Sequence, residues 1–248
     1  MREDICSIPI NDIFMPQTGD STGDSTASPT GCPFCRMRDM LEDRIATYIT
    51  GAAMMEPDVR EETNRLGFCE THFRHITARG SKLSVALILE SLTQEVHKSV
   101  FPKGGIAPKK LIAAVKARSE SCFICDSVGK NMVNLSENTL RLWQSEGEFR
   151  DLYAQQEHIC LLHYGKIMEL ALQKMNKKNF PLFAEETRKL SENYLSDLEK
   201  DVTHFCRMFD YRNKNADWGN SKDASDRAMT YLTSRKLEVD QKAEEKNR

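Results

Sequence analysis

Residues 180–211, FPLFAEETRKLSENYLSDLEKDVTHFCRMFDY, show the clearest helical pattern in the chain. Its apolar and aromatic side chains, with one threonine among them, recur mostly at three- and four-residue steps. The members of this series are Phe183, Thr187, Leu190, Tyr194, Leu198, Phe205 and Phe209. Such spacing places them along one face of a long α-helix. No part of the chain alternates polar and apolar residues for long enough to form a sheet, so the sequence predicts an all-α fold.

Composition excludes several classes of protein. The 248 residues carry 35 Lys+Arg against 37 Asp+Glu, a net charge of −2, whereas a dedicated nucleic-acid binder is usually basic. Twelve Gly and eight Pro are too few for a turn-dense β-sandwich. The N-terminus lacks the apolar run of a secretory signal, and no segment approaches the ~20 apolar residues of a membrane span. We therefore expect a cytoplasmic protein, with neither a nucleic acid nor a membrane as partner.

The cysteines form a duplicated pattern. A C-x2-C pair is followed, after 33 intervening residues, by a C-x2-H pair, and the same arrangement returns about 90 residues later with 34 intervening residues. The first copy consists of Cys32, Cys35, Cys69 and His72, and the second of Cys122, Cys125, Cys160 and His163. Self-similarity at a fixed offset indicates an internal repeat.

Each copy supplies the donors of a Cys3His zinc site. Zinc in structural sites takes four tetrahedral ligands, and two ligands three residues apart can reach one ion across a single helical turn. We expect each copy to bind one structural zinc ion, with a helical hairpin returning the second pair to the first. The predicted segments are an arm and flexible linker (1–31), two zinc-stabilised helical repeats (32–119 and 120–215), and a C-terminal turn and helix (216–248). We expect long C-terminal helices to pack against these repeats.

Several alternatives remain open for this pattern. An iron–sulfur cluster would usually use four cysteines, and buried thiols without metal are common. Cys32-Pro33-Phe34-Cys35 is similar to the glutaredoxin motif, but no βαβ unit surrounds it. The basic stretches lack the interleaved aromatic residues of a nucleic-acid reader. His158, two residues before Cys160, can replace His163 as ligand.

Other residues carry weaker expectations. Residues 8–14 can form a docked, extended arm, and residues 17–31 form a polar linker with GDST in tandem. Cys6 and Cys206 stand outside the pattern and are expected to be buried thiols. No catalytic residue is identified; an enzyme would use Asp58, Arg60 or Trp218 in a cleft between the repeats.

Five motifs together resemble a known family. They are CPFC (32–35), MMEPDVREETNRLGFCETH (54–72), CFIC (122–125), CLLHY (160–164) and FDYRNKNADWGNSKDA (209–224). The chain resembles, from about residue 8 to 232, a bacterial family of uncharacterised proteins, domain of unknown function 6062. The resemblance implies no reaction, because no activity is established for that family.

The sequence thus favours a bacterial, zinc-binding helical protein that acts by binding a protein partner or its own copy. Two other functions remain open: an enzyme with a site in the inter-repeat cleft, and a redox sensor in which thiol oxidation expels zinc.

Overall fold

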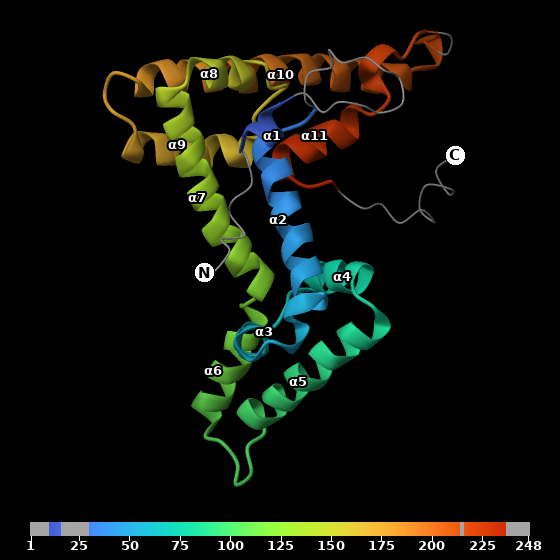
Figure 1. The fold of residues 1–248 in the computed structure, drawn as a ribbon. Coiled ribbons are helices and arrows are strands. Elements are labelled where there is room, and N and C mark those ends of the chain that lie inside the picture. Colours follow the sequence, from blue (N-terminus) through green and yellow to red (C-terminus); the bar gives the residue numbers. More distant parts are fainter. Residues whose placement is uncertain (1–9, 16–29, 214–215, 237–248) are drawn as a thin grey trace. The chain divides into compact units, whose positions relative to one another are not determined.

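The computed structural model describes residues 10–15, 30–213 and 216–236. Within them the chain forms eleven α-helices and three short 3-10 helices, with no strand (Figure 1). The predicted all-α class is confirmed. Most of the predicted linker, 17–31, lies outside the described residues, as does the chain beyond residue 236.

The chain divides into two compact units. Unit 2 comprises residues 37–134, and unit 1 comprises residues 1–36 together with 135–248. Two long helices, α2 (Pro33–Thr50) and α7 (Phe123–Ser145), each begin in one unit and end in the other. Each unit therefore takes the start of one long helix from the opposite half of the sequence, and the two repeats, 32–119 and 120–215, stay a prediction.

Unit 2 is built from the end of α2, the start of α7 and the helices between them. These are η1 (Ala52–Met55), α3 (Pro57–Leu66), α4 (Glu70–Arg79), α5 (Lys82–Val100) and α6 (Pro108–Ser119). Pro57 opens α3 at a position where its missing N–H costs nothing. Gly67 ends α3 with φ of 63°, a backbone angle that side chains disfavour. Leu41, Ile45 and Ile76 are among the buried core residues of this unit.

Unit 1 contains the start of α2, the end of α7 and the remaining helices. These are α1 (Ile10–Phe14), α8 (Gly147–Ala154), α9 (Leu161–Lys174), α10 (Phe180–Met208), η2 (Tyr211–Asn213), η3 (Gly219–Ser221) and α11 (Ala224–Thr233). Its core is aromatic. Phe14 is fully buried and packs on Phe149 and Tyr153, with ring centroids 5.0 and 5.8 Å away.

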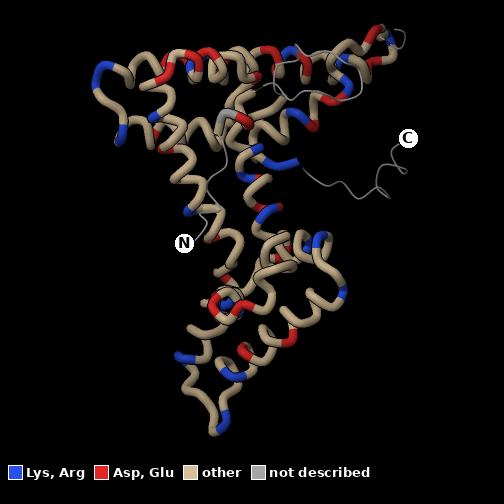
Figure 2. The backbone as a smooth tube through the Cα atoms, in the orientation of Figure 1, with Lys and Arg blue, Asp and Glu red and all other residues tan. Residues whose placement is uncertain are grey.

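Two details differ from the sequence expectations. The described part of the predicted arm, residues 10–14, is docked but forms the short helix α1 in place of an extended segment. In α10 the predicted face is buried at Phe183, Thr187 and Leu198, but Phe209 lies beyond the helix end and is 73% exposed. Residues of both charges are interspersed along α10 (Figure 2), and Arg188 and Glu192 among them are exposed, as expected for a solvated helix face.

Candidate metal centres

The eight predicted ligands gather into two groups of four, and each group lies within one unit. Site 1 consists of Cys32, Cys35, Cys160 and His163, and site 2 of Cys69, His72, Cys122 and Cys125. Within each group the donor atoms all lie within 4.8 Å of one another.

The predicted pairing of the ligands is wrong. Each C-x2-C pair meets the C-x2-H pair of the opposite sequence copy. The length of the helices gives the reason. α2 has 18 residues and is about 27 Å long, whereas the 10-residue α3 that follows spans only about 15 Å. The chain therefore does not return to Cys32 and Cys35 by the time it reaches Cys69.

Backbone contacts bring the two halves of site 2 together. Cys69 is the N-cap of α4 and His72 lies in its first turn, while Cys122 directly precedes α7. The N–H of Phe123, within the C-x2-C pair, donates to the carbonyl of Gly67, two residues before Cys69, at 2.9 Å. As a result, His72 Nδ1 lies 3.2 Å from the Sγ atoms of Cys69 and Cys122 and 3.3 Å from that of Cys125.

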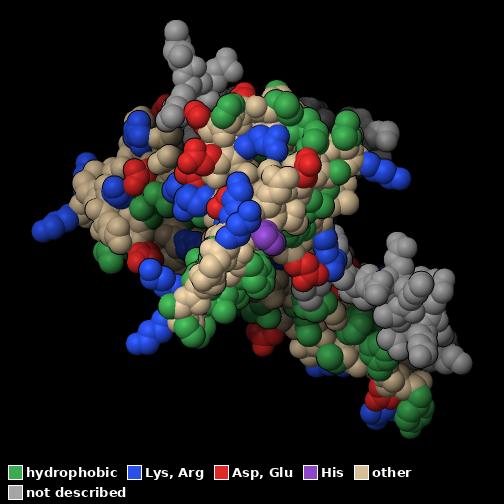
Figure 3. Space-filling view, turned by 90° about the horizontal axis from the view of Figure 1, so that it is seen from below, with side chains coloured by type: hydrophobic (Ala, Val, Ile, Leu, Met, Phe, Trp, Pro, Cys, Tyr) green, Lys and Arg blue, Asp and Glu red, His purple; other side chains and the backbone are tan. Residues whose placement is uncertain are grey.

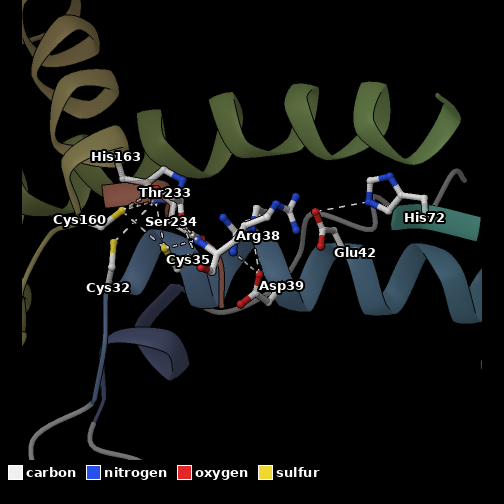
Figure 4. A network of polar contacts seen from close by, with 11 residues as sticks. Cys32, Cys35, Arg38, Asp39, Glu42, His72, Cys160, His163, Thr233 and Ser234 are labelled. Carbon is white, nitrogen blue, oxygen red and sulfur yellow. Dashed lines mark hydrogen bonds and ion pairs between the residues drawn. The ribbon is translucent and has the colours of Figure 1, made fainter. Parts of the chain in front are cut away.

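Site 1 is assembled in the same way at two other helix starts. Cys160 is the N-cap of α9, with His163 in the first turn, and Cys32 precedes α2. His163 Nδ1 lies 3.2 Å from Cys160 Sγ, 3.4 Å from Cys35 Sγ and 3.8 Å from Cys32 Sγ. Figure 4 shows these four side chains converging from α2 and α9.

The spacing of the donors fits a tetrahedral zinc ion. Zn–S bonds of about 2.3 Å and Zn–N bonds of about 2.0–2.1 Å place tetrahedral sulfurs about 3.8 Å apart, and sulfur about 3.6 Å from nitrogen. The Sγ–Sγ distances are 3.6 Å between Cys35 and Cys160 and 3.9 Å between Cys69 and Cys125. Three sulfurs and one imidazole nitrogen are also the donors that zinc, a borderline-soft ion, accepts.

Electrostatics favours a cation in each group. Hydrogen bonds with Cys160 and Cys32, together with burial, raise the pKa of Cys35 far above its ordinary value. In site 2, burial and the charge of Cys122 raise the pKa of Cys125 to about 12. Burial also raises the pKa of Cys122, but hydrogen bonds from His72 and from backbone groups outweigh it and lower the pKa to about 6. Three crowded thiols cannot all ionise without positive charge between them, and a bound dication supplies that charge.

Two further residues contact the ligands, and the sequence patterns did not predict them. Glu42 Oε1 lies 3.4 Å from His72 Nε2 in site 2. In site 1 the hydroxyl of Ser234 lies 3.0 Å from Cys160 Sγ (Figure 4). Neither residue belongs to a motif, and each lies far along the chain from the ligand it contacts, so no sequence signal identifies them.

The structure also places the other candidates. His158 stacks on Tyr194 with ring centroids 3.8 Å apart and belongs to neither group of ligands. Asp58 and Arg60 lie on α3, and Trp218 packs against Phe205 at 5.7 Å. None of these three residues lines the pocket beside α4, around Phe68 and Phe73, or the pocket beside α9, around Leu161 and Leu162.

Among the cysteines outside the pattern, Cys206 is exposed, so the expectation that it is buried is wrong, and Cys6 lies outside the described residues.

These features define a helical protein with two Cys3His centres, each joining helix starts that are distant in sequence. Residues 1–239 match a family of unknown function, DUF6062, and the chain belongs to that family. No curated protein and no solved structure matches the chain. Among the described residues, no helix has the combination of length and apolar character that crossing a membrane requires.

Proposed function

We propose that this chain binds two structural zinc ions and serves as a helical binding module for a protein partner or for a second copy of itself. The observation that carries this proposal is the closure of each donor set. Three sulfurs and one nitrogen at tetrahedral spacing complete the coordination of zinc, which leaves no open position for water or substrate. A catalytic zinc site would keep one position open.

The donor types favour zinc over other metals. Thiolates disfavour Mg²⁺ and Ca²⁺, which take oxygen ligands. Iron–sulfur clusters are generally held by four cysteines, and each set here contains a histidine. The closed shell favours a role in holding helix ends together, because ion binding contributes to folding wherever the ligands are not pre-arranged.

Two shallow pockets beside the metal centres support the binding role. One, of about 660 Å³, is lined by Phe68, Glu70, Phe73, Arg74, Thr77 and Ala78. The other, of about 500 Å³, is lined by Leu161, Leu162, Gly165, Lys166, Glu169 and Leu232. In both, the lining helix, α4 or α9, begins at a C-x2-H pair, so a bound ion fixes the start of the helix that presents the pocket. Hydrophobic side chains also reach the surface among charged ones elsewhere (Figure 3).

Metal analysis of the purified protein tests the zinc proposal. We expect two zinc ions per chain, one in Cys35→Ser and one in Cys125→Ser. Cys206→Ser, an exposed cysteine outside both sites, serves as the control and should retain two. Iron with visible absorption, or protein that is folded and free of metal, would contradict the proposal.

The binding role is tested on the leucines of the second pocket. Leu161 and Leu232 are 49% and 56% exposed, and Leu195, 44% exposed on α10, provides a matched control outside the pocket. Light scattering across a concentration series measures self-association, and cross-linking in bacterial lysate followed by mass spectrometry identifies protein partners. We expect wild type and Leu195→Ser to self-associate or to cross-link to a protein partner. The Leu161→Ser/Leu232→Ser variant should lose that interaction. A wild type that stays monomeric and shares all its cross-links with the double variant would refute the role.

A redox sensor is a second candidate, and the exposure of Cys125 favours it. Its thiol is accessible, and its Sγ lies 3.9 Å from that of Cys69. The Cys125 thiolate would attack a hydroperoxide, whose O–O bond breaks; one oxygen and a proton stay on sulfur as a sulfenic acid, and the other oxygen leaves as water or an alcohol. The Cys69 thiolate would then attack that sulfur and form a disulfide, and the hydroxide that leaves would take up a proton as water, so that the ion would lose two ligands. Zinc release at low peroxide, reversed by thiol and absent in Cys125→Ser, would support this function; zinc retained at oxidant excess would exclude it.

As part of the proposal, we place the protein in the bacterial cytoplasm. Metal-binding thiolates need a compartment in which cysteines stay reduced. The seven cysteines within the described residues are all free. Fractionation of the native bacterium tests this location.

A further inference from the structure

Glu42 is a buried acid that lies next to a ligand of site 2. It lies on α2 between the core residues Leu41 and Ile45, and its exposed fraction is only 2%. A carboxylate in such surroundings is costly unless it faces a hydrogen-bond donor or a positive charge. Its Oε1 lies 3.4 Å from Nε2 of His72, a residue on α4 that is 1% exposed (Figure 4).

The ring of His72 has two nitrogens with different surroundings. Nδ1 faces three sulfurs at 3.2, 3.2 and 3.3 Å, which is the ligand position of site 2. Nε2 is buried, and within the described part of the chain the Glu42 carboxylate is the polar group it faces. A neutral imidazole that ligates through Nδ1 carries its proton on Nε2, so this proton points toward a buried acceptor.

We propose that Glu42 is a positioning residue of site 2, which holds the His72 ring with Nδ1 toward the ion and fixes the tautomer that ligates. This inference rests on the proposed zinc-binding function. The carboxylate also increases the basicity of the imidazole and adds negative charge next to the dication. Histidine ligands of zinc are commonly oriented by such a carboxylate.

Site 1 provides an internal comparison. Among the described residues, no carboxylate forms an ion pair with His163. Ser234 contacts two sulfurs there instead: its hydroxyl lies 3.0 Å from Cys160 Sγ, and its carbonyl accepts from the Cys35 thiol at 3.6 Å. Loss of Glu42 should therefore weaken the ion of site 2 and leave that of site 1 in place.

Chelator competition on the full chain tests the inference. Zinc affinity is measured for wild type, Glu42→Leu and Glu42→Gln, with Asp43→Asn, the adjacent acid on the same helix, as the control. We expect Glu42→Leu to lose about 10- to 100-fold in affinity for one of its two ions. Glu42→Gln keeps an accepting oxygen, so its zinc affinity should lie between those of Glu42→Leu and wild type. The affinity of Asp43→Asn should match that of wild type. Equal affinity for both ions in wild type and Glu42→Leu would overturn the inference.

A second measurement does not depend on the Leu variant folding. In zinc-loaded wild type, nitrogen NMR of the imidazole should show a metal-bound Nδ1 and a slowly exchanging proton on Nε2 of His72. Glu42→Gln should keep the metal-bound Nδ1 but exchange the Nε2 proton faster. Coordination through Nε2, or an Nε2 proton that exchanges at the solvent rate, would refute the role of Glu42. A wild type that binds no metal would instead refute the proposed zinc function.

Discussion

Replacing two ligands in one chain tests which pairs share an ion. In the structure Cys35 and Cys160 belong to site 1, while Cys69 belongs to site 2. The double variant Cys35→Ser/Cys160→Ser damages one centre and should retain one zinc ion. The variant Cys35→Ser/Cys69→Ser damages both and should retain none. Pairing within each sequence copy would reverse these two results.

The number of residues between the paired ligands also sets how much stability the protein loses with each ion. Site 1 joins residues 125 apart and site 2 joins residues 56 apart. By the loop-closure relation for a covalent cross-link, constraining these loops in the unfolded chain adds about 5 kcal/mol at site 1 and about 4 kcal/mol at site 2 to the free energy of unfolding. The loss of either centre is therefore comparable with the lower end of a typical domain stability, about 5 kcal/mol.

Zinc content by mass spectrometry and unfolding in urea are the two assays. Single variants give the baseline, and Cys206→Ser controls for the loss of a thiol. The pairing is refuted if Cys35→Ser/Cys160→Ser binds no zinc while Cys35→Ser/Cys69→Ser keeps one. The stability argument is refuted if a variant that has lost an ion unfolds at the wild-type midpoint.

Three further predictions follow from the core and the centres. Phe14→Ala should cost about 3–5 kcal/mol in urea unfolding, because the ring is fully buried among aromatic neighbours, whereas Met15→Ala next to it, 46% exposed, should change little. Burial raises the pKa of Glu186, so its stabilising contribution is present below pH 4.5 and is lost as the pH rises through the raised pKa. Glu186→Gln should therefore raise the melting temperature at pH 7 and leave it unchanged at pH 4; an equal gain at both pH values would contradict this cause. Acidification should release both ions as protons compete for the thiolates, which a chromogenic chelator detects, and retention of zinc at pH 3 would argue against thiolate ligation.

Local sequence patterns were sufficient to predict the helices and to identify the candidate ligands. The series from Phe183 to Leu198 follows the 3.6-residue period, and its buried members lie on one face of α10. A C-x2-C or C-x2-H pair spans one helical turn, so its two donors converge wherever the helix starts. Phe209 shows where the period fails, because the helix ends at Met208 and the next aromatic side chain turns to solvent.

The helical class and the two sets of thiolate and imidazole donors can be read from the sequence, because both depend on contacts within a few residues. Which pairs share a centre, and that Glu42 and Ser234 contact the ligands, follows from the three-dimensional fold alone. Pairing across 56 or 125 residues depends on where long helices lead the chain. α2 and α7 each begin in one unit and end in the other, so the donors that meet are not those closest in sequence.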